Sequence, residues 1–437
     1  MIYGASGFAG RRILAAALER GLRPVVAGRS EGPVRALADR HRLPSRVFPL
    51  TDPGALAEGL KGVDLVLNAA GPATAEHLAR ACIAHGVHCL DIGCELRSLR
   101  RLAAMDDAAH EAGVAVIAGA GFSPAVAEAL ALHLKRRLPG AVRLTIALCA
   151  PVQPSPGLIR SGLEIALRPS AALRRGRIKT MRRRRLRRFD FGRGPEPCYG
   201  LGWGELAAVH RATGVRNVDF FVRARPDLAR LLRLSPVLAA CRRLPFLHRR
   251  FDSFAEAHGE PPSGRRGRSR LVGYAYDPAG RRAASRVHLP DPWTVTAQLA
   301  AVALARAAAT PVSPGVQSAA QFLGSDFLAE MPGLHVDWEE LELSAPGDLK
   351  LCVRRRVPLA RRLARLWPGR KRAEEDTAVG DPGTAGKDRA EPVPLPRKPV
   401  LQPVGSGDPG TGAEPRGTDP SQTDGWQAAV EGIRRTG

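Results

Sequence analysis

The sequence predicts an α/β protein: an N-terminal doubly wound parallel sheet of the Rossmann type, a second α+β domain and a disordered C-terminal tail. Two observations carry this prediction. A turn with three glycines follows the first three residues, and short apolar runs then alternate with helical segments as far as residue 118. Such alternation is typical of parallel strands joined by helices. The predicted domains are residues 1–125 (NAD(P)-binding), 126–368 (substrate) and 369–437 (low-complexity tail).

The glycine-rich turn lies within the first ten residues, MIYGASGFAG, which place a glycine at every third position from residue 4. Glycine lets a dinucleotide pyrophosphate approach bare backbone, and the N-terminus of the following helix offers it unpaired N–H groups. We therefore expect the whole turn to contact a dinucleotide; its residues are Gly4, Ala5, Ser6, Gly7, Phe8, Ala9 and Gly10. The strand before the turn is shorter than the usual five or so residues, so a start further upstream is left open.

The second predicted strand lies within residues 23–30 and ends in Gly28, Arg29 and Ser30. In a dinucleotide fold this strand end meets the ribose of the adenosine. An acidic residue there would favour the 2′-hydroxyl of NAD, whereas a cation with a hydroxyl suits the 2′-phosphate of NADP. Arg29 and Ser30 thus predict NADP as the cofactor, with NAD as the second possibility and a solvated surface arginine as the alternative interpretation.

The third apolar strand ends in small residues, which would let a cofactor lie across the edge of the sheet. Before it, Asp52 is expected to cap a helix that has Pro53 at its first position. The strand itself lies within residues 63–72, and its candidate cofactor contacts are Asn68, Ala70 and Gly71. The remaining elements predicted for this domain are a helix at 74–85, a strand at 87–92, a helix at 98–112 and a strand at 114–118.

Five segments in this order resemble one family of enzymes. They are GASGFAG at 4–10, AGRS at 27–30, GVDLVLNAAGP at 62–72, ACIAHGVHCLDIGCE at 81–95 and AGAGFSPAVAEALALHL at 118–134. Together they resemble the saccharopine dehydrogenase-like oxidoreductases: the saccharopine dehydrogenase NADP-binding domain family and its trans-acting enoyl reductase relatives. The resemblance is strong over residues 1–135 and continues more weakly to about 345. It implies an NAD(P)-dependent oxidoreductase whose second domain closes over the nicotinamide, with a loop at 311–316 near the active cleft.

The resemblance leaves the substrate open, because members of a fold family can differ in their chemistry. The first hypothesis is a reductase of an apolar or lipid-linked enoyl or carbonyl compound. The second is a saccharopine-type amino-acid dehydrogenase, and the third is a non-catalytic NADP-binding protein. Since the cofactor supplies the hard step, no catalytic residue is assigned from the sequence. The polar side chains at the predicted strand ends are candidate orienting groups: Asn68, Asp91, Glu95 and Ser123. Cys94 is expected to be a passive thiol.

The second domain is expected to begin with a strand from residue 142. A helix at 159–167, a β-hairpin with strands at 271–276 and 283–289, and a helix at 294–309 follow. A dense basic run occupies residues 173–188. It is either a site for an anionic partner, such as a lipid headgroup, an acyl carrier protein or coenzyme A, or a solvated loop or strand edge. Residues 220–250 are expected to pack in the core or an interface, with a membrane surface as the alternative.

Composition narrows the range of partners. The 437 residues carry a formal net charge of +24, but the cations are nearly all arginine and aromatic residues make up only 5%. With no nucleic-acid-binding motif in sight, no specific nucleic-acid partner is predicted. Seven cysteines without a CxxC pair, and no recognisable secretion signal, favour reduced thiols and a cytoplasmic location. No metal site is predicted; peripheral membrane contact and a homodimer are left open.

Overall fold

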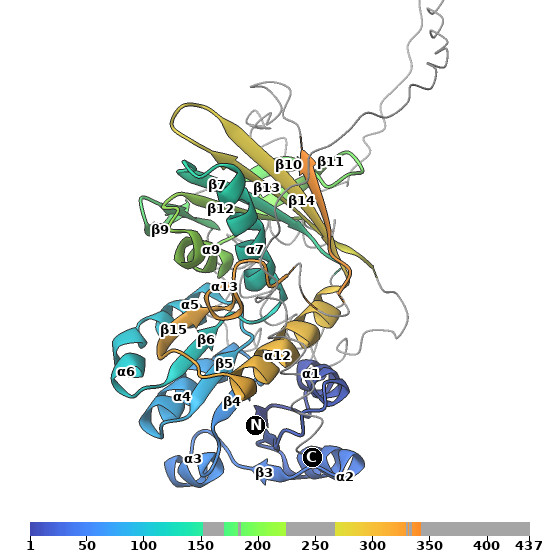
Figure 1. The fold of residues 1–437 in the computed structure, drawn as a ribbon, viewed down its shortest axis with the longest axis vertical. Helices are drawn as coiled ribbons and strands as arrows, with labels where there is room; N and C mark the ends of the chain where they lie inside the picture. The colour runs from blue at the N-terminus through green and yellow to red at the C-terminus, as the bar shows by residue number, and fades with distance from the viewer. Residues whose placement is uncertain (152–169, 182–184, 224–266, 329–330, 332–333, 342–437) are drawn as a thin grey trace, which may run out of the picture. The chain divides into compact units, whose positions relative to one another are not determined.

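The computed structural model describes residues 1–151, 170–181, 185–223, 267–328, 331 and 334–341. All of these residues belong to one compact unit, Met1–Val353. Their strands form two sheets, one from the N-terminal part of the chain and one from the middle of it (Figure 1). The predicted helix at 159–167, most of the 220–250 segment and the predicted tail lie outside the described residues.

The first sheet consists of seven parallel strands in the order β15-β6-β5-β4-β1-β2-β3. The chain starts in the middle at β1, builds one side through β3 and then crosses to build the other, as in a doubly wound dinucleotide fold. The predicted fold class is confirmed. The strands are β1 (Ile2–Tyr3), β2 (Val26–Gly28), β3 (Ser45–Val47), β4 (Leu65–Asn68), β5 (His88–Asp91), β6 (Ala115–Ala118) and β15 (Gly315–Ser318).

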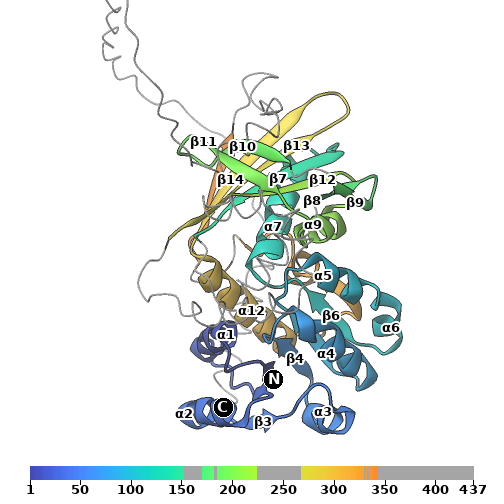
Figure 2. The same ribbon diagram turned by 180° about the vertical axis from the view of Figure 1, so that it is seen from behind.

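Helices cover both faces of this sheet, because successive strand residues point to opposite sides. Val66 and Val116 pack in one apolar cluster, whereas their chain neighbours Leu67 and Ile117 pack in another. The first cluster takes in α3 (Pro53–Leu60) and α4 (Pro72–Ala84). The second takes in α1 (Phe8–Glu19), α2 (Glu31–His41) and α12 (Pro292–Ala309), and α12 lies against α1 in both views (Figures 1 and 2).

Two local predictions for the helices have different outcomes. Asp52 caps α3 as expected, since its carboxylate accepts hydrogen bonds from the amides of Gly54 (2.9 Å) and Ala55 (3.1 Å), with Pro53 at the first position. The single helix predicted at 98–112 is instead two helices, α5 (Leu96–Ala103) and α6 (Asp106–Glu111). The break has a physical reason: the acidic side chains of residues 106 and 107 favour a new helix N-terminus at that point.

The second sheet has nine strands, and seven of them lie in the order β10-β11-β12-β7-β13-β14-β16. β12 and β7 run parallel, while β8 and β9 extend the sheet from β12. The strands are β7 (Arg143–Cys149), β8 (Ser170–Arg174), β9 (Arg177–Met181), β10 (Leu186–Asp190), β11 (Pro195–Gly200), β12 (Val218–Arg223), β13 (Ser269–Tyr276), β14 (Arg282–Leu289) and β16 (Asp337–Leu341).

The two faces of the second sheet differ in what covers them. Leu144, Ile146 and Phe220 face the apolar cluster that also contains residues of α7 (Phe122–Arg137) and α9 (Glu205–Thr213). Ala147 and Phe221 point to the opposite face, where a smaller cluster includes residues of β10, β11 and β13. The predicted hairpin is present as β13 and β14 (Figure 2). The described part of the basic run at 173–188 includes the end of β8, the whole of β9 and the start of β10.

The predicted loop at 311–316 is wrong only at its end. Residues 311–314 contain no helix or strand, as expected, but Gly315 and Val316 begin β15, which pairs in parallel with β6 at the edge of the first sheet. The approach of this segment to an active cleft stays a prediction. Arg211 of α9 and Asp106 of α6 hold this strand through the carbonyl (2.5 Å) and the amide (2.6 Å) of Val316. The first sheet therefore takes its last strand from beyond the predicted domain boundary at residue 125, which itself falls inside α7.

Within the described part of the chain, none of the helices has the length and the apolar character needed to cross a bilayer. The same residues contain no cluster of three or more side chains suited to holding a metal ion.

Candidate functional site

The glycine turn between β1 and α1 is built so tightly that side chains do not fit at two of its positions. Gly4 has a φ of +83°, and a Cβ there would lie 2.6 Å from the amide nitrogen of Ala70. A Cβ on Gly10 would lie 2.2 Å from the carbonyl oxygen of Gly4. The start of α1 is therefore pressed against the turn, and the turn against the loop that follows β4. Glycine at both positions is required by these close approaches.

The outer side of the turn offers backbone amides to a ligand. Ser6, Phe8 and Ala9 are partly exposed and Gly7 is exposed, whereas Ala5 and Gly10 are buried. Gly7 is the N-cap of α1 and gives it no side-chain cap, so the first-turn N–H groups are available to an anion at the positive end of the helix dipole. This geometry suits the pyrophosphate of a dinucleotide, and the contact of these residues with it stays a prediction.

The side chain of Phe8 has a structural contact of its own. Its ring meets the indole of Trp293 edge-on, with centroids 4.9 Å apart, and the Arg12 guanidinium lies 3.8 Å from the ring centroid. Trp293 belongs to α12, so this contact links the beginning of α1 to a helix almost three hundred residues later in the chain. The turn is thus supported from outside its own strand and helix.

Arg29 and Ser30 follow directly after β2, next to β1 in the sheet, and both are exposed. Ser30 is the N-cap of α2, but its hydroxyl makes no capping hydrogen bond. The neighbouring acidic group, Glu31, forms an ion pair with Arg35 at 2.8 Å. A cation and a hydroxyl are therefore presented at the strand end where an adenosine ribose would lie. Their contact with a 2′-phosphate stays a prediction.

Asn68 is buried at the end of β4 and shapes the loop that follows it. Its Nδ2 donates to Asp91 (2.7 Å) and its Oδ1 accepts from the Ala70 amide (3.1 Å) and the Thr74 hydroxyl (2.9 Å). Asn68 thereby holds the turn at Ala70 and Gly71, whose φ is +104°. The side chain positions a loop at the cofactor edge, and the contact of Asn68, Ala70 and Gly71 with a cofactor stays a prediction.

Asp91 is the second buried polar group at this edge, at the end of β5. Besides Asn68, its carboxylate accepts a hydrogen bond from the amide of Gly93 at 2.8 Å. Burial raises the pKa of Asp91 to about 6, and the nearby charge of Glu95 adds to the rise. Asp91 therefore holds the 91–95 loop in place, and this fully buried carboxyl titrates close to neutral pH.

The sequence did not point to the third buried polar group, Glu205. The hydroxyl of Ser123, near the start of α7, donates to its Oε1, while its Oε2 has no hydrogen-bond partner among the described residues. Burial raises the pKa of Glu205 to about 7. Glu205 belongs to the first turn of α9, in the other part of the fold, and no motif marks it. Only the contact with Ser123, 82 positions earlier, identifies it.

Cys94 lies between these groups, and the structure agrees with its expected passive role. Burial and the neighbouring carboxyl groups of Glu95 and Glu205 raise the pKa of its thiol well above the usual range, which disfavours the reactive thiolate. Its carbonyl accepts a hydrogen bond from the amide of Gly204 (3.0 Å), where a Cβ would lie only 2.3 Å from that oxygen. This close approach brings the 91–95 loop against the start of α9.

These groups gather at one edge of the first sheet, because the carboxyl ends of parallel strands all lie on the same side. The glycine turn follows β1, Arg29 follows β2, and Asn68 and Asp91 end β4 and β5. Ser123 lies in the first turn of α7, the helix that follows β6. One part of the edge thus offers backbone amides suited to phosphates, and another part contains buried carboxyl groups that can hold a proton. It suits a dinucleotide-dependent reaction that also needs a proton.

Comparison with known proteins agrees with this geometry. Residues 1–117 match the model of a protein family described as the saccharopine dehydrogenase NADP binding domain. No curated protein matches the chain. The match confirms the predicted NADP-binding domain over the first sheet as far as β6.

Among solved structures, the apo saccharopine dehydrogenase (L-Glu forming) of Saccharomyces cerevisiae is similar over 78% of this chain and 99% of its own, with 15% identity and a TM-score of 0.55. GenD2 from gentamicin A biosynthesis, in complex with NAD, has 17% identity over 65% of this chain and 70% of its own, with a TM-score of 0.32. A probable dehydrogenase from Thermotoga maritima has 12% identity, coverages of 65% and 74%, and a TM-score of 0.35.

The yeast enzyme shows a saccharopine dehydrogenase-like fold over 78% of the chain, a larger part than the residues 1–117 that the family model matches. The cofactor domain and the fold together agree with the predicted NADP-dependent oxidoreductase.

Proposed function

We propose that this chain, which has a saccharopine dehydrogenase-type NADP-binding domain on a saccharopine dehydrogenase-like fold, is an NADPH-dependent reductase of apolar or lipid-linked enoyl or carbonyl compounds. The observation that carries the proposal is the Ser123–Glu205 pair, which lies at the same sheet edge as the glycine turn. NADPH, when bound, supplies the hydride. The groups of the protein then have to orient the substrate, exclude water and provide a proton.

The Ser123–Glu205 pair is suited to providing that proton. Saturating a double bond adds one hydride, which brings the electron pair of one new bond to hydrogen, and one proton, which is bound by the electron pair of the broken π bond. Because burial raises the pKa of Glu205 to about 7, its carboxyl group keeps a proton near neutral pH, where an ideal general acid should titrate. The Ser123 hydroxyl contacts this carboxyl and stands nearer to the partly exposed edge.

Charge at this edge favours an uncharged reacting group over an amino-acid substrate. Asp91 and Glu205 are held by neutral partners, Asn68, the Gly93 amide and Ser123. A saccharopine-type substrate carries several carboxylates, which require cations or many N–H donors. The buried carboxyl groups offer no such counter-charge. This contrast supports the enoyl or carbonyl substrate and ranks the amino-acid dehydrogenase second.

The test is a substrate panel with purified full-length chain, following NADPH oxidation with enoyl thioesters and long-chain aldehydes and NADP reduction with saccharopine. Turnover of an enoyl or carbonyl compound, lost in Glu205→Gln but retained in Glu111→Gln, an exposed glutamate of α6, supports the proposal. Turnover of saccharopine alone would establish the amino-acid dehydrogenase instead. NADPH binding without any turnover would favour the non-catalytic protein.

A further inference from the structure

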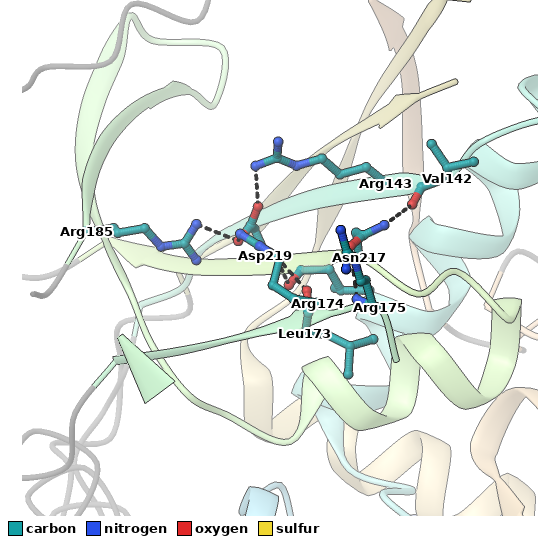
Figure 3. Close-up of polar contacts among 9 residues, drawn as sticks. Val142, Arg143, Leu173, Arg174, Arg175, Arg185, Asn217 and Asp219 are labelled. Atoms are coloured by element: carbon teal, nitrogen blue, oxygen red, sulfur yellow. Dashed lines mark hydrogen bonds and ion pairs between the residues drawn. The ribbon is translucent and has the colours of Figure 1, made fainter. Parts of the chain in front are cut away.

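The strongest concentration of charge outside the cofactor edge surrounds Asp219 on β12. The Asp219 side chain is 0% exposed, and three arginines from different segments contact its carboxylate: Arg143 at 2.7 Å, Arg174 at 2.6 Å and Arg185 at 2.5 Å (Figure 3). Burial alone would raise the pKa of Asp219, but the guanidinium groups outweigh it and lower that pKa. The carboxylate is therefore ionised, and it neutralises only one of the three positive charges.

A fourth arginine adds to this excess. Arg187 of β10 is half-buried. Its guanidinium lies 5.5 Å from the ring centroid of Phe221, and that of Arg185 lies 5.1 Å from the same centroid. Asp219 is the carboxylate that stabilises its charge, while Arg143 and Arg185 oppose it. We call these four side chains and Asp219 the arginine cluster. Four guanidinium groups against one carboxylate leave a net charge of +3 on a partly buried face of the sheet.

Several N–H groups of the arginine cluster have no acceptor. Arg185 Nε and Nη2, Arg143 Nε and Arg187 Nε are buried and make no hydrogen bond to any described residue. The hydroxyl of Thr145, which is fully buried on β7 and paired in register with Asp219, also makes no hydrogen bond to any described residue. Burying a charged donor without an acceptor lowers the stability of the folded protein, and several such donors around one point are unusual. An anion would supply the missing hydrogen-bond acceptors.

A second basic feature, a hollow of about 440 Å³, lies on the side of the second sheet that α7 and α9 cover. Lys135, Arg175 and Arg216 contribute to its lining, and neither a carboxylate nor any residue of the arginine cluster does. Asp219 points to the opposite face, with Phe221. Asn217, at the strand end, hydrogen-bonds the Val142 carbonyl (3.0 Å) and the Arg175 amide (3.1 Å) (Figure 3). The hollow is therefore separate from the arginine cluster.

We propose that the arginine cluster binds the phosphate group of a small-molecule phosphomonoester. A phosphate dianion has several acceptor oxygens and matches the planar fork of arginine, which donates two parallel hydrogen bonds. This site is separate from the cofactor edge and does not depend on the reductase proposal.

The burial of the arginines favours a small molecule over a flat polyanion. The side chains of Arg174 and Arg185 are only 24% and 21% exposed and are fixed by Asp219. A membrane surface or a nucleic acid engages long, freely exposed basic side chains over a wide area. Here the donors converge on one point, which suits one compact phosphate group.

The experiment titrates the full chain by calorimetry with inorganic phosphate, glycerol 3-phosphate and coenzyme A, in buffer without other multivalent anions. Arg187→Gln is the main variant, because it removes a cluster charge without breaking a described ion pair to Asp219. Arg185→Gln is the second variant. The matched control is Arg188→Gln, the same substitution at an exposed position on the same strand. Arg29→Ala controls for phosphate at the cofactor edge.

We expect Arg187→Gln and Arg185→Gln each to weaken phosphate binding by roughly tenfold to hundredfold, as the loss of a charged hydrogen bond would. Arg188→Gln should bind like the unmodified chain, and a loss of binding confined to Arg29→Ala would place the bound phosphate at the cofactor edge and overturn the proposal. Tighter binding of coenzyme A than of glycerol 3-phosphate would identify a nucleotide-bearing source of the phosphate; the reverse would identify a small sugar- or glycerol-type phosphate. The proposal is overturned by the absence of binding at roughly 10 mM phosphate, by equal weakening in Arg188→Gln, or by binding only to anionic lipid vesicles.

Discussion

Arg29 is the residue on which the choice between the two cofactors depends. It is exposed at the end of β2, beside the Ser30 hydroxyl, and forms no ion pair among the described residues. We expect Arg29→Ala to weaken NADPH binding by about tenfold or more while leaving NADH binding almost unchanged, because only NADPH has the 2′-phosphate. Titration of nicotinamide fluorescence measures both. Arg40→Ala, an equally exposed arginine of α2, is the control; equal losses for both nucleotides would disprove the assignment.

Glu205 carries the second prediction at this scale. Its carboxyl group has a pKa of about 7 because it is buried, so the protonated fraction falls as the pH rises through neutrality. The rate of NADPH oxidation with an active substrate should therefore decline above about pH 7. In Glu205→Gln it should be roughly a hundredfold lower and lose that decline. Glu128→Gln, which alters another buried glutamate, is the control. A decline that persists in Glu205→Gln would remove Glu205 from the reaction.

The residues of the candidate site differ in whether the local sequence identifies them. The glycine turn, Arg29 and Asn68 could be placed at strand ends from the sequence because each belongs to a short motif there, and their cofactor contacts stay predictions. Glu205 could not be identified, since its contact with Ser123 comes from a different helix and a distant part of the sequence. Arg174 and Arg185 were visible in a basic run, but their common partner is a carboxylate that β12 supplies.

Among the elements, the turn between β1 and α1 depends most on individual glycines. A Cβ at Gly10 would lie 2.2 Å from the Gly4 carbonyl oxygen, and neither atom belongs to a flexible side chain. We expect Gly10→Ala to lower the free energy of unfolding by at least about 2 kcal/mol and to weaken NADPH binding. Gly32→Ala is the matched control: no atom lies within 4 Å of its Cβ position in α2. That control should be neutral or stabilising by up to about 1 kcal/mol. Urea unfolding of both variants measures these free energies. If Gly10→Ala were as stable as Gly32→Ala, the turn could relax to make room for the added Cβ.

Elements with strong local patterns were predicted well, and those that depend on distant partners were not. The buried runs of β4, β5 and β6 and the β13–β14 hairpin have continuous apolar or hairpin patterns. β15 has none: four residues, Gly315–Ser318, follow a proline-containing loop and become a strand only because β6 offers its free edge. The break between α5 and α6 also depends on a distant partner, since the carboxylate of Asp106 accepts a hydrogen bond from the amide of Val316 in that same strand.

At the scale of the whole molecule, buried carboxyl groups link the two sheets. Glu128 of α7 accepts a hydrogen bond from the amide of Ala320 (2.9 Å), at the start of the short helix α13 (Ala319–Leu323) that follows β15. Ser123 and Glu205 join α7 to α9 in the same way. The helices between the sheets are thus tied by groups that prefer to be protonated, which couples the stability of the fold to pH.

The sign of this coupling gives the last prediction. Burial raises the pKa of Glu128 from 4.5 to about 8, so between these values the folded chain holds a proton that the unfolded chain has lost. Its stabilising contribution is complete below about pH 4.5 and is lost as the pH rises towards 8, with a slope of at most ~1.4 kcal/mol per pH unit. Asp91 and Glu205 contribute in the same direction up to about pH 6 and 7.

The buried N-terminus of Met1 acts in the opposite direction, because burial lowers its pKa from 8.0 to about 6 and its contribution to stability rises with pH between these values. The test is therefore a difference between two chains. Glu128→Gln keeps an acceptor for the Ala320 amide but cannot ionise, so between pH 7 and 8 the urea midpoint of the unmodified chain should fall relative to that of Glu128→Gln. Glu111→Gln, at an exposed position, should follow the unmodified chain. If the unmodified chain and Glu128→Gln had the same slope, the carboxyl group of Glu128 would have to be ionised in the folded protein and paired with the nearby Arg211.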